Sequence, residues 1–243
     1  SLSFDSNLFQ KQYETNKYQL NLNNSLVYSS PKKFSKNGLV KDFKLKLLNP
    51  NERLKTGYEG ESKSKNQLLS QFMYSLTYPL KKQSTIGSSF ITPGLSYRFS
   101  PNMTKNLSNK DRILDITNIN SFDRLSENDA VEGGHSITAG IGYKKNDLSG
   151  NEKVSLELAQ VVSDGPNPDL PNKTTLNKKY SDIIGNLKFK INDILNFDYS
   201  FMLDDGLNKS NFNSIKTSLT LNNLVTTFEY LEEGEIIGTN HYV

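Results

Sequence analysis

The sequence predicts an all-β protein: an antiparallel, up-and-down transmembrane β-barrel of about twelve strands, or an incomplete segment of one. Three observations predict this fold class. Large apolar residues alternate with polar ones in many short segments of the 243-residue chain, and successive side chains of a strand point to opposite faces. The gaps between these segments are alternately long and short. Only 35% of the residues are hydrophobic although 10% are aromatic, which suits strands with one apolar face joined by polar loops.

The strand pattern is clearest in residues 195–203. Leu195, Phe197 and Tyr199 lie on one parity, and Asp198 lies in the middle of the other. No helical period competes over a comparable length. In chain order, the alternation predicts strands within residues 2–9, 18–28, 43–47, 72–78, 95–99, 137–144, 154–158, 187–191, 195–203, 215–221, 224–230 and 236–243, of which the first and last have the weakest pattern.

The connections between these strands are sorted by length. Long or medium gaps (49–65, 100–134, 163–179 and 205–210) alternate with short ones (81–85, 145–149, 192–193 and 222–223). Outer-membrane barrels have long loops at one end and tight turns at the other, whereas a soluble β-sandwich has no reason to sort its loops by end. The pairs Asn192-Asp193 and Asn222-Asn223 tolerate the positive φ angles of tight hairpin turns.

The composition excludes several classes of protein. No apolar run approaches the ~18 residues of a membrane-spanning helix, so a helical membrane protein is excluded. The net charge of +3 is spread along the chain and lacks the basic cluster of a nucleic-acid binder. Without cysteine there is no disulfide and no thiolate metal site. Because the chain begins at Ser1 without a signal-like segment, we expect a mature product or a fragment.

Two segments resemble a known family. The first has Pro93, Tyr97 and Pro101 at a strand end and continues into a long loop with Phe122, Asp123, Arg124, Asp129, Val131, Glu132, Gly133, Gly134, Gly140 and Tyr143. The second has Leu170, Pro171, Ser181, Asp182, Ile184, Gly185, Leu203 and Asp204. Together they cover residues 90–211 and resemble the barrel domain of the outer-membrane lipopolysaccharide-assembly family, LptD, also known as the organic-solvent-tolerance family.

The resemblance implies a barrel in the bacterial outer membrane that inserts lipopolysaccharide into the outer leaflet. Its implied partners are lipopolysaccharide, outer-membrane lipids, an LptE-like plug lipoprotein, and a periplasmic bridge protein that contacts a family domain absent from this chain. We expect residues 1–243 to be one barrel-domain fragment that includes the long loop 100–134. No cofactor, enzymatic activity or nucleic-acid partner is expected.

The polar faces of the strands supply the candidate lumen-facing residues. A lumen with a basic excess attracts the phosphates and acidic sugars of an anionic glycolipid. The alternative is that these charges only hydrate a water-filled interior. The candidates are Lys44, Lys46, Arg98, Lys144, Lys188, Lys190, Asp198 and Lys216.

The loop 100–134 is the best candidate for a functional segment, because loops of this length are usually functional or disordered. Its motif residues are Asp123, Arg124, Asp129, Glu132, Gly133 and Gly134. The acidic residues could bind a divalent cation beside lipopolysaccharide phosphates, although their spacing matches no EF-hand. The alternative is that Asp123 and Arg124 form ion pairs, and that the two glycines let the chain turn into the next strand.

Other interpretations remain open. A passive porin or a ligand-gated uptake barrel has the same strand pattern, and a soluble β-sandwich binding module would cover the apolar parity of residues 195–203 with a second sheet. The only two histidines are His135 and His241, and neighbouring His135 and Ser136 point to opposite faces, so they form no catalytic dyad. Pro93 lacks a backbone donor and predicts a bulge or a weak point in strand pairing, or a gate.

Overall fold

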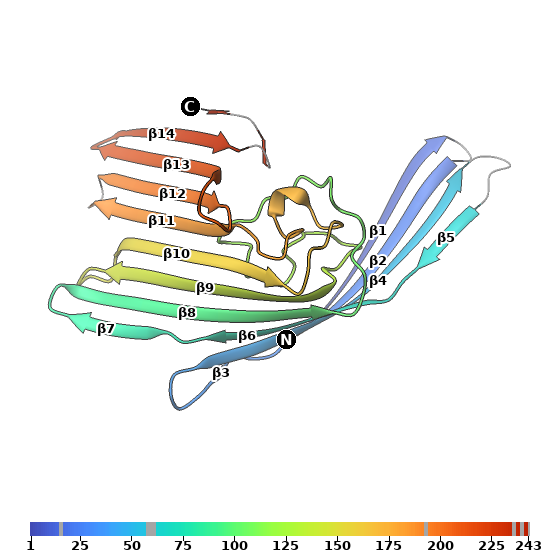
Figure 1. The fold of residues 1–243 in the computed structure, drawn as a ribbon, viewed down its shortest axis with the longest axis horizontal. Coiled ribbons are helices and arrows are strands. Elements are labelled where there is room, and N and C mark those ends of the chain that lie inside the picture. The colour runs from blue at the N-terminus through green and yellow to red at the C-terminus, as the bar shows by residue number, and fades with distance from the viewer. Residues whose placement is uncertain (15–16, 57–61, 192–193, 235–236, 239–240, 243) are drawn as a thin grey trace.

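The strands form one curved, antiparallel sheet (Figure 1). The computed structural model describes residues 1–14, 17–56, 62–191, 194–234, 237–238 and 241–242. Within them the sheet has 15 strands, and twelve of these follow one continuous path in chain order. Each strand on the path pairs antiparallel with the next, so the topology is up-and-down. β1 and β15 lie at the two ends of the path and do not pair with each other among the described residues. The predicted fold class is confirmed, as an open barrel segment.

The path consists of β1 (Leu2–Glu14), β2 (Lys17–Ser29), β4 (Val40–Thr56), β6 (Leu69–Thr77), β8 (Gly87–Ser100), β9 (Gly134–Asn146), β10 (Glu152–Ser163), β11 (Ile183–Ile191), β12 (Leu195–Leu203), β13 (Ser210–Leu221), β14 (Leu224–Glu233) and β15 (His241–Tyr242). Three short strands pair beside it: β3 (Lys33–Phe34) and β5 (Ser62–Asn66) with β4, and β7 (Leu80–Ser84) with β8. The described helical structure is one 3₁₀ turn, Asn172–Thr174, and none of it is long and apolar enough to cross a bilayer.

The two faces of the sheet differ in chemistry. We call the face with Lys46 and Arg98 the inner face and the opposite one the outer face. In β12 the odd residues from Leu195 to Leu203 are only half-buried, and no second sheet covers them in the described structure. The outer face therefore exposes large apolar side chains across many strands, among them Phe4, Leu26, Leu45, Leu47, Leu95, Tyr97, Ile137, Ile141, Phe189, Ile191, Leu219 and Phe228.

The two long loops, 101–133 and 164–182, fold onto the inner face, and we call them the cap (Figure 1). Apolar cap residues pack on inner-face residues at one end of β10, β11 and β12, where the polar pattern gives way to Ala159, Val161, Ile184 and Met202. Burial of this apolar surface stabilises the docked cap. The cap contributes Leu107, Leu114, Ile119, Leu125, Ala130, Leu170 and Leu176 to this core.

The structure differs from the sequence prediction at residues 81–85 and 49–65. Residues 81–85 were expected to be a short connection, but β7 continues to Ser84 in register with β8, so the turn is shorter. Residues 49–65 were expected to form a long loop, but β4 continues to Thr56 in unbroken register with β2, and β5 pairs back onto it. The apolar–polar alternation stops here because nearly all side chains on both faces of this extension are polar. The hydrogen bonds between the strand backbones do not require apolar side chains, so the strand continues.

Two predictions about the connections can be compared with the structure. Asn222 has a φ of 52°, as expected for its tight turn, whereas Asn192-Asp193 lie outside the described residues. At Pro93 there is no bulge towards β9, but the partner on the other side changes from β6 to β7. Pro93 therefore marks a weak point in pairing.

Candidate functional site

A buried ionic cluster fixes the cap to the inner face. Arg124 is fully buried and binds both carboxylate oxygens of Glu132 through one edge of its guanidinium, with Nε donating to Oε2 at 2.6 Å and Nη2 paired with Oε1. The remaining donors of Arg124 bind the hydroxyls of Ser136 at 3.0 Å and Thr138 at 3.1 Å on β9. A buried charge is tolerated only when it is paired and hydrogen-bonded, and Arg124 meets both conditions.

Two basic residues of the strands extend this cluster. Arg98 on β8 donates to the backbone oxygens of Ser121, at 2.6 Å, and Phe122, and its Nε lies 3.8 Å from Glu132 Oε2. Lys46 on β4 pairs with Asp123 at 2.6 Å. Strand cations therefore bind both the backbone and the carboxylates of the 101–133 loop.

The two glycines close the loop, as one of the alternatives predicts. A Cβ on Gly133 would lie 2.3 Å from the backbone oxygen of Asn102, so no larger residue fits there. Gly134 has a φ of +85°, which disfavours residues with a side chain, and it begins β9.

The electrostatics of Glu132 give a pH prediction. Burial raises the pKa of Glu132, but the charges of Arg124 and Arg98, with hydrogen bonds from Arg124 and Ser136, outweigh burial and lower the pKa to about 2. A carboxyl whose pKa is lower in the folded state stabilises the protein above its unfolded pKa, near 4.5, and this contribution is lost as the pH falls towards 2. We expect the free energy of unfolding to fall over this range more steeply for the wild type than for Glu132→Gln. Denaturant titrations at several pH values check this, and equal slopes would contradict it.

A second polar cluster lies beneath the other cap loop. Asp182 is fully buried, accepts from Asn211 Nδ2 at 2.6 Å, and lies 3.5 Å from Lys178 Nζ. Burial raises the pKa of Asp182 more than Asn211 and Lys178 lower it. The hydrogen bond from Asn211 ties the 164–182 loop to β13, and within the loop the backbone N–H of Asp182 donates to Thr175 Oγ1 at 2.9 Å.

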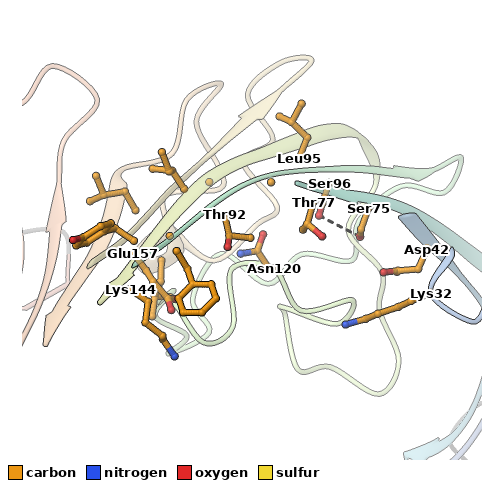
Figure 2. Close-up of a pocket in the computed structure, with 18 of the residues that line it drawn as sticks. Lys32, Asp42, Ser75, Thr77, Thr92, Leu95, Ser96, Asn120, Lys144 and Glu157 are labelled. Atoms are coloured by element: carbon orange, nitrogen blue, oxygen red, sulfur yellow. Dashed lines mark hydrogen bonds between the residues drawn. The ribbon is translucent and has the colours of Figure 1, made fainter. Parts of the chain in front are cut away.

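Beside the cap, the inner face has a hollow of about 800 Å³ across β4, β6, β8, β9 and β10. Its floor consists largely of small residues, with the larger Met73 and Phe90 also in the lining, and its border carries Lys32, Asp42, Lys144 and Glu157 (Figure 2). Asn120 of the cap lines the same hollow, while Leu95 points away from it to the outer face. The small floor residues are Ser75, Thr77, Thr92, Gly94, Ser96, Gly140 and Gly142.

The C-terminal strands carry a row of alternating charges on the inner face. Lys188, Asp198, Lys216 and Glu229 are paired in register across β11 to β14. Lys188 lies 3.7 Å from Asp198, and Lys216 lies 3.6 Å from Glu229. A recess of about 300 Å³ is lined by Lys188, Lys190, Asp198 and Lys216.

All candidate residues of the strands lie on the inner face, but in three different surroundings. Lys46 and Arg98 are buried under the cap, Lys44 and Lys144 border the hollow, and the other four line the C-terminal recess. In the 101–133 loop, Asp129 pairs with Lys105 at 2.5 Å. Among the described residues, no group of three or more His, Asp or Glu side chains is arranged to hold a metal ion.

Sequence reasoning did not identify several residues of the site. Ser136 and Thr138 bind Arg124, and Gln71 Nε2 donates to the backbone oxygen of Phe122 at 3.3 Å. All three residues belong to the polar face of their strands, which the alternation predicts. The alternation does not show which of the many polar residues on that face bind the cap.

Comparison with known proteins extends the resemblance to nearly the whole chain. A search of curated proteins finds no match. The family model described as LPS transport system D matches residues 7–240, which include part of β1, all of β2 to β14, the cap and the ionic cluster. The chain therefore belongs to the LptD family.

Proposed function

We propose that this chain is part of an outer-membrane barrel that passes lipopolysaccharide to the outer leaflet, with the saccharide moving along the inner face. The outer face anchors the strands in lipid, because its exposed side chains are large and apolar. The inner face offers a hydrated surface to sugars and phosphates. The role is transport and not catalysis.

The observation that carries this proposal is the hollow beside the cap. Its floor of hydroxyls and bare glycine backbone can exchange hydrogen bonds with sugars and presents few bulky side chains that would obstruct a long saccharide. The border carries Lys32, Lys44 and Lys144 against Asp42 and Glu157, and this small basic excess favours an anionic glycolipid over a neutral one. The cap packs onto one end of the inner face, which disfavours a permanently open porin.

The partners follow from this role. Lipopolysaccharide contacts the inner face, outer-membrane lipids contact the outer face, and an LptE-like plug lipoprotein occupies the enclosed space of the complete barrel. A periplasmic bridge protein delivers the glycolipid through another domain of the family.

Site-specific photo-crosslinking in cells tests the proposal. A photoreactive residue is placed at Thr92, in the hollow, or at Leu95, three residues along the same strand on the outer face. We expect lipopolysaccharide adducts at Thr92 that disappear soon after lipopolysaccharide synthesis is stopped, because they report molecules in transit. Adducts at Leu95 report resident lipid and should persist. The proposal fails if Thr92 captures no lipopolysaccharide or if its adducts persist equally.

A further inference from the structure

Three strands extend beyond the cap and form an arm. It consists of residues 8–14 of β1, 17–23 of β2 and 50–56 of β4, with β5 paired to β4 (Figure 1). Seven residues of strand project roughly 20 Å. The arm lies at the same end of the sheet as the cap, because the loop that follows Ser100 also starts there.

A change in polarity along the outer face indicates where these strands leave the lipid. Ser6, Asn24 and Asn49 are paired in register across β1, β2 and β4, and they form a polar row on the outer face. Ser6 Oγ donates to Asn24 Oδ1 at 2.7 Å. On one side of this row lie the apolar residues Phe4, Leu26 and Leu47. On the other side lies the arm, whose outer face carries Arg53 and Lys55 beside Leu8, Leu20 and Leu22. Charged side chains such as Arg53 and Lys55 are costly in hydrocarbon, so the arm extends from the edge of the hydrocarbon layer into water on the side of the cap.

The inner face of the arm is basic. Lys11 pairs in register with Gln19, Gln19 with Leu54, and Leu54 with Lys63, so these four residues form one row on this face. Lys17 and Lys65 lie on the same face in the adjacent rows. All four lysines are exposed, and none has an ion-pair partner among the described residues. Glu52 lies on the same face directly opposite Lys65 without an ion pair to it, and accepts from Gln19 Nε2 at 2.9 Å.

Two of these lysines contact the same aromatic ring. Lys11 Nζ lies 4.9 Å from the centroid of the Tyr13 ring, and Lys17 Nζ lies 5.9 Å from it. The ring attracts both ammonium groups and so brings like charges together. The carboxylate nearest in register, Glu14 opposite Lys17, forms no ion pair with it. Close cations without a carboxylate partner favour a bound anion.

The distance between the lysines suits a ligand that carries several anionic groups. Lys11 and Lys63 are separated by three strand-to-strand steps, which is about 14 Å. A single phosphate cannot reach both, whereas a saccharide with phosphates on different sugars can.

We propose that the inner face of the arm, through Lys11 and Lys17 at Tyr13 and through Lys63 and Lys65 on β5, binds phosphate groups on the saccharide of lipopolysaccharide on the outer side of the membrane, the side to which the long loops of outer-membrane barrels project. This inference rests on the proposed function and adds a second contact site to it. The inner wall guides the saccharide, and the arm then holds its phosphorylated part by charge.

The test compares two ligands and two variants of the whole chain in detergent. The ligands are purified lipopolysaccharide and the same preparation after chemical removal of its phosphates. The arm variant carries Lys11→Gln, Lys17→Gln and Lys63→Gln. The control carries Lys41→Gln, Lys81→Gln and Lys82→Gln, three exposed lysines at the opposite end of the strands. Circular dichroism establishes that both variants remain folded.

We expect the arm variant to bind phosphorylated lipopolysaccharide at least about tenfold more weakly than the wild type, with a weaker salt dependence, because each lysine near an anionic surface strengthens binding severalfold. The control should bind like the wild type, and removing the phosphates should abolish the difference between wild type and arm variant. Equal binding by the wild type and the arm variant would overturn this inference alone. A wild-type chain that binds neither ligand would overturn the proposed function as well.

Discussion

Replacing Arg124 with methionine is expected to lower the free energy of unfolding by about 3–5 kcal/mol and to release the 101–133 loop from the inner face. Methionine approximates the volume of the side chain but leaves the buried Glu132 without its bidentate partner. Arg98 remains at 3.8 Å and compensates only in part. Denaturant unfolding measures the loss, and limited proteolysis after Lys105 and Lys110 reports the release of the loop.

Two further variants test whether the effect of Arg124→Met comes from loss of the buried ion pair. Lys105→Met removes an ion pair with Asp129 in which the lysine is 54% exposed, and this should cost at most about 1 kcal/mol. Adding Glu132→Gln to Arg124→Met should restore part of the stability, because the unpaired buried charge is then gone. A cap that stays protease-resistant in Arg124→Met would show that the apolar core alone holds it.

Placing arginine at Leu95 is expected to destabilise the membrane-inserted protein by about 2–4 kcal/mol. Leu95 is 51% exposed, lies near the middle of β8 and points away from the hollow (Figure 2). In a bilayer its surroundings would be hydrocarbon, where an arginine side chain is poorly solvated. Unfolding from lipid vesicles, followed by tyrosine fluorescence and gel mobility, measures the effect.

The adjacent residue provides the matched control. Ser96 lies on the inner face, bonded to Ser75 Oγ at 3.3 Å, and borders the hollow. Ser96→Arg puts the same side chain into a hydrated space and should cost less than 1 kcal/mol. Equal destabilisation by the two variants would mean that both faces of the sheet contact the same surroundings, which would contradict an outer face in hydrocarbon and an inner face in water.

The strands could be predicted because their signal is local. A period of two follows from backbone geometry, so residues such as Leu195 and Asp198 identify their faces without knowledge of any neighbour. The order of the strands also follows from the sequence, since short turns force consecutive strands to pair.

The cap could not be predicted because it depends on contacts distant in sequence. The ion pair of Lys46 with Asp123 spans 77 residues, and strand parity says nothing about what covers a face. One signal was present. Ile184 and Met202 interrupt the polar parity near one end of their strands, and apolar residues on a hydrated face predict a covering segment.

Residues 50–56 of β4 and the whole of β5 were missed for a different physical reason, whereas residues 18–23 of β2 lie within a predicted strand. In this part of β4 both faces carry polar residues such as Asn51 and Arg53, so its alternation stops, whereas the paired β2 keeps Leu20 and Leu22 on its outer face. The backbone ladder between β2 and β4 nevertheless continues, because its hydrogen bonds do not depend on side-chain polarity.

The most direct test of the account is a nitroxide scan along β12. The chain has no cysteine, so single cysteines can be introduced and labelled one at a time from residue 195 to 203 in the protein embedded in lipid vesicles. We predict that oxygen, which concentrates in hydrocarbon, reaches labels at 195, 197, 199, 201 and 203, whereas a water-soluble nickel chelate reaches those at 196, 198 and 200. Equal accessibility at both parities, or chelate access at the odd positions, would contradict an outer face in lipid and an inner face in water.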